Sequence, residues 1–151
     1  MAILSADMKR VVTEQKLGFV ATVSPDGTPN LSPKGTTAVW DDDTLVFADI
    51  SSPQTVANLR ANPRVEINVV DVVRRKGYRF KGTATVYGEG AKFDELLAFY
   101  GGRGTTSPID HIVLVAVAQA SALFSPAYDQ GQSEAEIAAR WERYWDDLRG
   151  R

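Results

Sequence analysis

The stretch "DISSPQTVANLRANP", residues 49–63, gathers the side chains that could bind an anion. Ser52 is a typical N-cap residue, and Pro53 is a typical first residue of a helix. The free backbone N–H groups and the positive dipole end of such a helix can bind a phosphate group. Thr55 adds a hydroxyl group at the third helical position. Taken alone, the stretch is better explained as an ordinary helix cap, because caps commonly occur without ligands.

The other residue types offer few means of catalysis. The absence of cysteine excludes disulfides, thiolate metal sites and cysteine nucleophiles. The single histidine, His111, begins an apolar segment and is interpreted as a structural residue rather than a base or a ligand. The acidic run at residues 41–43 is interpreted as a solvated turn, so no metal site is predicted. No phosphate-binding glycine motif and no nucleophile elbow is present.

The composition sets limits on partners and location. The chain has 151 residues, 44% of them hydrophobic, and a net charge of −2, which gives no basis for binding nucleic acid or an anionic membrane. The longest apolar run, "IVLVAVA", is far shorter than the roughly 20 residues of a membrane-spanning helix. The start of the chain lacks the pattern of a signal peptide. We therefore expect a cytoplasmic protein.

The elements that would position these residues alternate between short strands and helices. The patterns predict a single domain over residues 1–151, with six strands joined mostly as hairpins, and helices that cover the ends of the sheet. Strands are predicted at 18–23, 29–40, 45–50, 64–72, 78–88 and 111–125, and helices at 5–16, 53–61, 92–100 and about 133–148. Pro33 and Gly35 indicate a bulge or a sheet edge. The expected fold is mainly β, a six-stranded antiparallel split β-barrel with flanking helices.

The segment from about residue 11 to residue 124 resembles the pyridoxamine 5′-phosphate oxidase-like, flavin-binding split barrels. The similarity lies in the hairpin "ATVSPDGTPNLSPKG", the turn and strand "DDDTLVF", and the later strand "FKGTATVY". It also lies in the signature T-x-x-N-L-x-x-N-P-x-V, which starts at Thr55 and includes Asn58 and Pro63.

The resemblance implies a homodimer that binds two FMN molecules across its subunit interface. It places the second strand along the flavin ring and the helix start at the phosphate. The cofactor-binding residues implied are Ser32, Pro33, Lys34, Gly35, Asp49, Ser51, Ser52, Gln54, Thr55 and Asn58. Many relatives have Lys or Arg where this chain has Gln54, so Lys34, Arg79 or Lys81 would have to compensate for the missing charge.

The resemblance also implies a function in redox chemistry. An FMN-dependent oxidoreductase acting on a small molecule is expected first, since the flavin itself carries the chemistry and needs few catalytic side chains. A flavin electron carrier that serves a redox partner is the second possibility, and a protein that binds F420 or haem on the same barrel is the third. The aromatic stripe of the C-terminal helix, which includes Trp141 and Trp145, is interpreted as core or dimer contact, or less simply as a lid over the partner's flavin.

Overall fold

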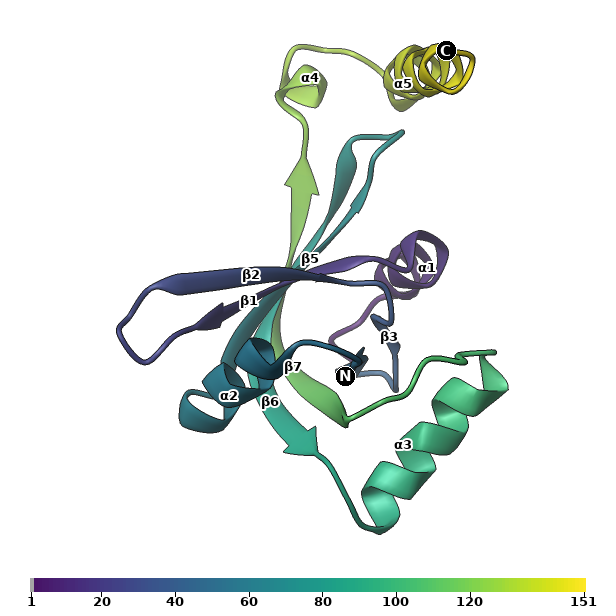
Figure 1. Cartoon of the computed structure of the whole chain (residues 1–151). Helices are drawn as coiled ribbons and strands as arrows, with labels where there is room; N and C mark the ends of the chain where they lie inside the picture. The colour runs from purple at the N-terminus through teal and green to yellow at the C-terminus, as the bar shows by residue number, and fades with distance from the viewer. Residues whose placement is uncertain (1) are drawn as a thin grey trace.

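The computed structural model describes residues 2–151 and shows one antiparallel sheet curled into a half-barrel, with helices around it (Figure 1). The elements in chain order are α1 (Ala6–Gln15), β1 (Gly18–Val23), β2 (Pro29–Lys34), β3 (Ala38–Val39), β4 (Thr44–Asp49), α2 (Pro53–Ala61), β5 (Arg64–Asp71), β6 (Lys76–Tyr87), α3 (Ala91–Gly102), β7 (His111–Phe124), α4 (Pro126–Asp129) and α5 (Glu134–Arg149).

The sheet has the strand order β2-β1-β5-β6-β7-β4-β3, and each pair of neighbours is antiparallel. The expected split barrel is thereby confirmed, with seven strands in place of six. The extra strand arises because the predicted strand 29–40 is interrupted after Lys34, where Thr37 bonds back to the Lys34 carbonyl through its backbone N–H and its hydroxyl. The chain then crosses from one edge strand, β2, to the opposite edge strand, β3.

Two apolar clusters hold the half-barrel together. The first packs α1, through Val11 and Val12, against the inner side of the sheet, where Phe80 and Ile67 are fully buried. The second packs α3, through Leu96 and Tyr100, against β3, β4 and β7. Alternate residues of β7 enter different clusters, so one chain buries Ile112, Val113, Val115 and Val117, whereas Ala116 and Ala118 are exposed.

The helix ends follow the predicted signals closely. Helix α2 has the predicted bounds, and Ser133 with Glu136 forms the predicted capping box at the start of α5. Figure 1 shows α5 apart from the half-barrel, beside the end of the β5–β6 hairpin, where Arg75 lies over the Trp141 ring and Lys76 pairs with Glu134. Over residues 2–151, no helix combines the length and the apolar character needed to cross a membrane.

Candidate functional site at the start of helix α2

The turn between β4 and α2 is fixed by a buried carboxylate. Asp49 ends β4 with only 2% of its surface exposed, and its Oδ1 accepts a hydrogen bond of 2.6 Å from the backbone N–H of Ser52. Pro53 then starts α2, and Pro63 follows soon after its end, as the sequence predicts. Asp49 therefore sets where the N-terminus of the helix lies.

The predicted side-chain cap does not form. Ser52 occupies the N-cap position, but its hydroxyl makes no capping hydrogen bond to the helix. It instead accepts a hydrogen bond from the ammonium group of Lys34. Within the described residues, no side chain therefore caps the first turn of α2. Gln54 is the exposed residue of this turn that carries a backbone N–H, whereas Thr55 is buried and the Val56 N–H bonds to the Ser52 carbonyl.

Lys34 is the cation of the site. It ends β2 with 5% of its surface exposed, and its Nζ also donates to Ser32 Oγ at 2.9 Å. Within residues 2–151 these two hydroxyls are its hydrogen-bond partners, and it takes part in no ion pair. Burial lowers the pKa of the Lys34 ammonium, and the negative charge of Asp49 opposes this shift. A buried ammonium with neutral partners lies beside a helix start, which is a favourable setting for an anion.

A chain of amide and hydroxyl groups joins α2 to the β1–β2 hairpin. Gln54 Nε2 donates to Asn58 Oδ1 at 2.7 Å, and Asn58 Nδ2 donates to Thr22 Oγ1 at 3.0 Å and to Ser24 Oγ at 3.4 Å. Asn58 is completely buried, so these bonds satisfy a side chain that water does not reach. They fix the face of α2 that lies toward the second strand, where the flavin ring is expected.

The structure gathers part of the predicted site. Ser32, Lys34, Asp49 and Ser52 lie together at the start of α2, with Gln54 and Asn58 on the neighbouring helix face. Three other predicted residues lie elsewhere around this centre. Pro33 is exposed on the opposite face of β2, Thr55 is only 1% exposed beneath the helix, and a Cβ on Gly35 would meet open space.

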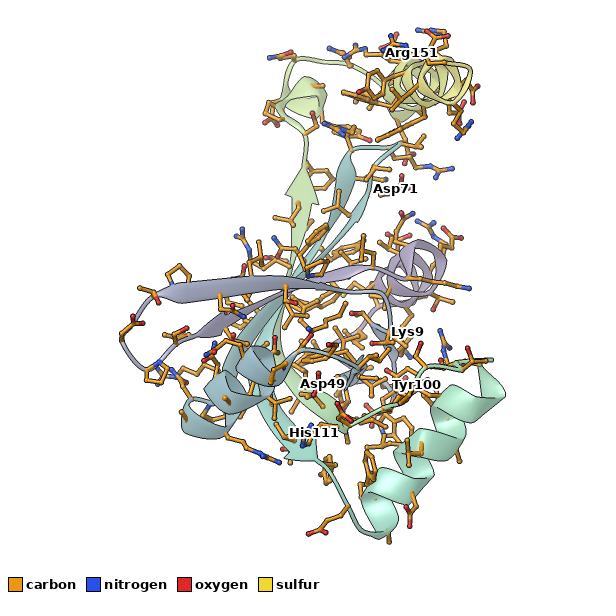
Figure 2. All side chains as sticks on the ribbon, in the orientation of Figure 1. Lys9, Asp49, Asp71, Tyr100, His111 and Arg151 are labelled. Atoms are coloured by element: carbon orange, nitrogen blue, oxygen red, sulfur yellow. The ribbon has the colours of Figure 1, made fainter. Side chains whose placement is uncertain are left out.

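Ser51 lies on a different flank of α2. It borders a cleft of ≈ 640 Å³ together with Asp49, Arg60 and His111. His111 pairs with Asp49 across the β4–β7 register, and its Nδ1 is 3.1 Å from Asp49 Oδ2 (Figure 2). His111 was expected to be a structural residue, and its Nδ1 atom has such a role, because it bonds to Asp49. Its Nε2 atom has no hydrogen-bond partner within the described residues. No local pattern links two residues 62 positions apart, so only the strand register reveals the pair.

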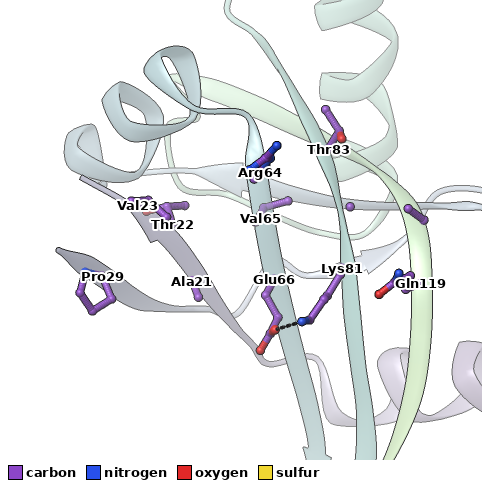
Figure 3. A pocket seen from close by; sticks show the side chains of 12 residues that line it. Ala21, Thr22, Val23, Pro29, Arg64, Val65, Glu66, Lys81, Thr83 and Gln119 are labelled. Atoms are coloured by element: carbon purple, nitrogen blue, oxygen red, sulfur yellow. Dashed lines mark ion pairs between the residues drawn. The ribbon is translucent and has the colours of Figure 1, made fainter. Parts of the chain in front are cut away.

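Arg79 and Lys81 do not supply the charge that Gln54 lacks. Both lie on the outer face of the sheet beside Glu66, with nitrogen–oxygen distances of 3.2 Å for Arg79 and 3.7 Å for Lys81. Figure 3 shows the Lys81–Glu66 pair. Near them, Ala21, Val23 and Pro29 help to line an open hollow of ≈ 440 Å³. Lys34, by contrast, lies at the helix start, beside Ser52.

Comparison with known proteins agrees with this architecture. HupZ of Group A Streptococcus is 35% identical, with a TM-score of 0.72 over 80% of this chain and 94% of that chain. A structure described as F420 Reductase is 27% identical, with a TM-score of 0.60 over 78% and 98% of the two chains. An FMN-binding protein of Syntrophomonas wolfei shares the fold, with a TM-score of 0.66 over 78% and 84% at 17% identity.

Sequence comparison identifies the family. An uncharacterized protein of Methanocaldococcus jannaschii is 33% identical over 79 residues, which is 51% of this chain and about half, 52%, of the length of that relative. The sequence pattern of the family described as "Pyridoxamine 5'-phosphate oxidase" matches residues 4–146, nearly the whole chain. Together with the split barrel, this match shows that the chain belongs to the pyridoxamine 5′-phosphate oxidase family.

Proposed function

We propose that the protein binds FMN with the phosphate at the start of α2, between the helix N–H groups and the Lys34 ammonium. The observation that carries this proposal is the burial of Lys34 beside an N-cap serine that does not cap its helix. Burying an ammonium group with only neutral hydroxyl partners costs free energy, and a bound phosphate would offset that cost. The residues present thus fit a cofactor that ends in a phosphate group.

We further propose an FMN-dependent oxidoreductase that acts on a small molecule. Bound FMN would supply hydride and electron transfer. The chain itself would hold the phosphate through Lys34 and Ser52, and would orient the ring along β2 through Ser32 and the strand backbone. The network from Gln54 to Thr22 would keep α2 at a fixed distance from β1, the strand that pairs with β2. An electron carrier would need the same contacts, so turnover must be measured separately.

The active form is proposed to be a homodimer. The support is the outer face of the β1–β2 hairpin, where Phe19, Val23 and Leu31 are exposed large apolar residues and Leu31 reaches 66% exposure. A second copy that covers this face would bury side chains that water now contacts. Sedimentation that shows only monomer at micromolar concentration would contradict this arrangement.

The deciding experiment is an absorbance spectrum of the purified protein, followed by the mass of the ligand released on denaturation. Oxidised-flavin bands and the mass of FMN are the expected result, and a Soret band would indicate haem instead. Consumption of NAD(P)H with an added acceptor would then separate an enzyme from a carrier. A protein that neither carries nor takes up FMN would contradict the proposal.

F420 is the second candidate cofactor, favoured by the 27% identity and matching fold of the F420 Reductase structure. F420 also carries a phosphate group, so the Lys34 site would suit it equally well. Competition distinguishes the two: the apo protein is titrated with FMN and with F420 under the same conditions. The tighter ligand identifies the cofactor, and we expect FMN.

A further inference from the structure

A second group of polar side chains lies on the other flank of α2, away from Lys34. Two hollows of ≈ 640 Å³ and ≈ 380 Å³ share Arg60 and His111 in their walls. Ser51 borders the larger one, and Gly88 borders the smaller one. Both hollows lie beside Arg60 and His111, and neither is lined by Ser32, Lys34 or Ser52.

Asp49 determines which nitrogen of His111 faces this cleft. The Asp49 carboxylate is 2% exposed and accepts from the Ser52 N–H through its other oxygen. An ionised carboxylate only accepts hydrogen bonds, so His111 Nδ1 must carry a hydrogen and donate it to Asp49. In neutral His111 the Nε2 atom then holds a lone pair, and in charged His111 it is a second donor.

Arg60 and the imidazole of His111 both approach the backbone at Gly88. A Cβ on Gly88 would lie 3.0 Å from Cδ2 and 3.4 Å from Nε2 of His111, and 3.9 Å from an Arg60 guanidinium nitrogen. Both groups therefore come together above Gly88. Within residues 2–151, Arg60 takes part in no ion pair, so its donors are free to bind a ligand.

The two flanks of α2 are separate surfaces. Gln54 and Asn58 are one turn apart and face the β1–β2 hairpin, whereas Pro53, Ala57 and Arg60 form another stripe beside His111. At 3.6 residues per turn the two stripes lie about a third of a turn apart. FMN has one phosphate, which the Lys34 flank would hold, so the His111 flank remains available to a different ligand.

From this geometry we propose that Arg60 and protonated His111 form a second oxyanion-binding site, one that takes the carboxylate or phosphate group of a small-molecule ligand. Arg60 supplies planar paired donors, His111 supplies the Nε2 donor, and Ser51 can add a hydroxyl. The other charged groups that face His111 are the buried Asp49 and the exposed Glu89 and Asp110 at the rim. That this site is free for a second ligand rests on the proposed placement of the FMN phosphate at Lys34.

The test uses sulfate, an oxyanion whose charge stays constant over the useful pH range. His111 is the only histidine, so its imidazole signals in nuclear magnetic resonance spectra are assigned without ambiguity. Added sulfate should shift those signals in a saturable way, and chloride at equal ionic strength should not. Calorimetry should show saturable sulfate binding that chloride at equal ionic strength does not reproduce.

Arg60→Gln should weaken sulfate binding by roughly tenfold, since it removes a charge-assisted hydrogen bond. His111→Gln should also weaken sulfate binding, because it removes the imidazole donor from the cleft. Arg64→Gln is the matched control, because Arg64 is also exposed but lies on β5, outside the cleft. Urea midpoints of the three variants identify any loss that arises from unfolding. Binding that is unchanged in Arg60→Gln, or weakened equally in Arg64→Gln, would overturn the site.

Saturation with FMN separates this inference from the proposed function. We expect sulfate to shift the His111 signals equally with and without bound FMN. If FMN abolishes the shift, the cleft belongs to the flavin phosphate, and the second site is refuted while flavin binding stands. If the protein fails to bind FMN yet binds sulfate at His111, the proposed function fails and the second site stands.

Discussion

Replacing Lys34 with methionine tests the proposed phosphate site most directly. Methionine keeps an unbranched apolar chain of similar length and removes the charge. In the wild-type protein the ammonium donates to Ser32 and Ser52 at the start of α2. The variant therefore removes the cation from the site while leaving the helix N–H groups in place.

The expected loss follows from the kind of bond removed. A charge-assisted hydrogen bond contributes about 1.5–3 kcal/mol, so Lys34→Met should raise the FMN dissociation constant by roughly 10- to 150-fold. Riboflavin lacks the phosphate, so its dissociation constant should change only a few-fold. The ratio of the two losses measures how far Lys34 acts through the phosphate.

The stability of the apo protein should respond differently. Burial lowers the pKa of Lys34 in the folded state below the ordinary lysine value of 10.5, so folding disfavours the charged form. The unfolded chain thus binds more protons, and this group contributes stability that rises as the pH increases toward 10.5. At neutral pH the ammonium opposes folding, while its two hydroxyl contacts favour it. We therefore expect the free energy of unfolding of Lys34→Met to stay within about 1 kcal/mol of wild type.

Flavin fluorescence titration measures both dissociation constants, and urea unfolding followed by tryptophan fluorescence measures stability. Lys9→Met is the matched control. Lys9 lies on α1, outside the proposed site, and pairs with Asp42. Equal losses for FMN and riboflavin would mean that Lys34 acts through the fold. An unchanged FMN affinity would refute the assignment of Lys34 to the phosphate.

Three further predictions concern the surroundings of the site. Gln54→Lys should tighten FMN binding by about fivefold, equivalent to about 1 kcal/mol, because it adds a cation at the helix start. Fluorescence titration measures the dissociation constant, and weaker binding would contradict this prediction. Asn58→Ala should lower the free energy of unfolding by about 1–3 kcal/mol in urea, because it leaves Thr22 and Ser24 without their buried partner. Leu31→Glu should convert the proposed dimer to monomer in sedimentation while circular dichroism stays unchanged, and a dimer that persists would move the interface elsewhere.

The local elements could be predicted because their signals are local. Pro53 and Pro63 define α2, and Ser133 with Glu136 defines the start of α5. The division of the second strand was not predictable in the same way. Pro33 and Gly35 indicated a bulge or a sheet edge, and β2 is an edge strand. The stretch "SPKGTTAV" does not show that the chain then joins the opposite edge of the sheet at Ala38. That outcome depends on how the whole sheet curls.

The site could be predicted only where its residues are close in sequence. The resemblance named Asp49, Ser52 and Asn58 together, and the structure places these three residues at the start and on the face of one helix. The resemblance could not show that Lys34 takes the hydroxyl of Ser52 away from capping, or that His111 binds Asp49 from a strand 62 residues later. Both contacts depend on tertiary packing, and both alter the chemistry expected of the residues involved.

The position of Asp49 also limits where a phosphate can bind. A carboxylate repels an anion, yet Asp49 is buried within electrostatic reach of Lys34. Its Oδ1 atom accepts from the Ser52 N–H and its Oδ2 atom bonds to His111. Both carboxylate oxygens are therefore already engaged by groups of the chain itself. An anion is stabilised only if it lies closer to Lys34 and the free N–H groups than to Asp49. A bound phosphate must therefore lie on the β2 flank of the helix start, with Asp49 behind it as the group that fixes the turn.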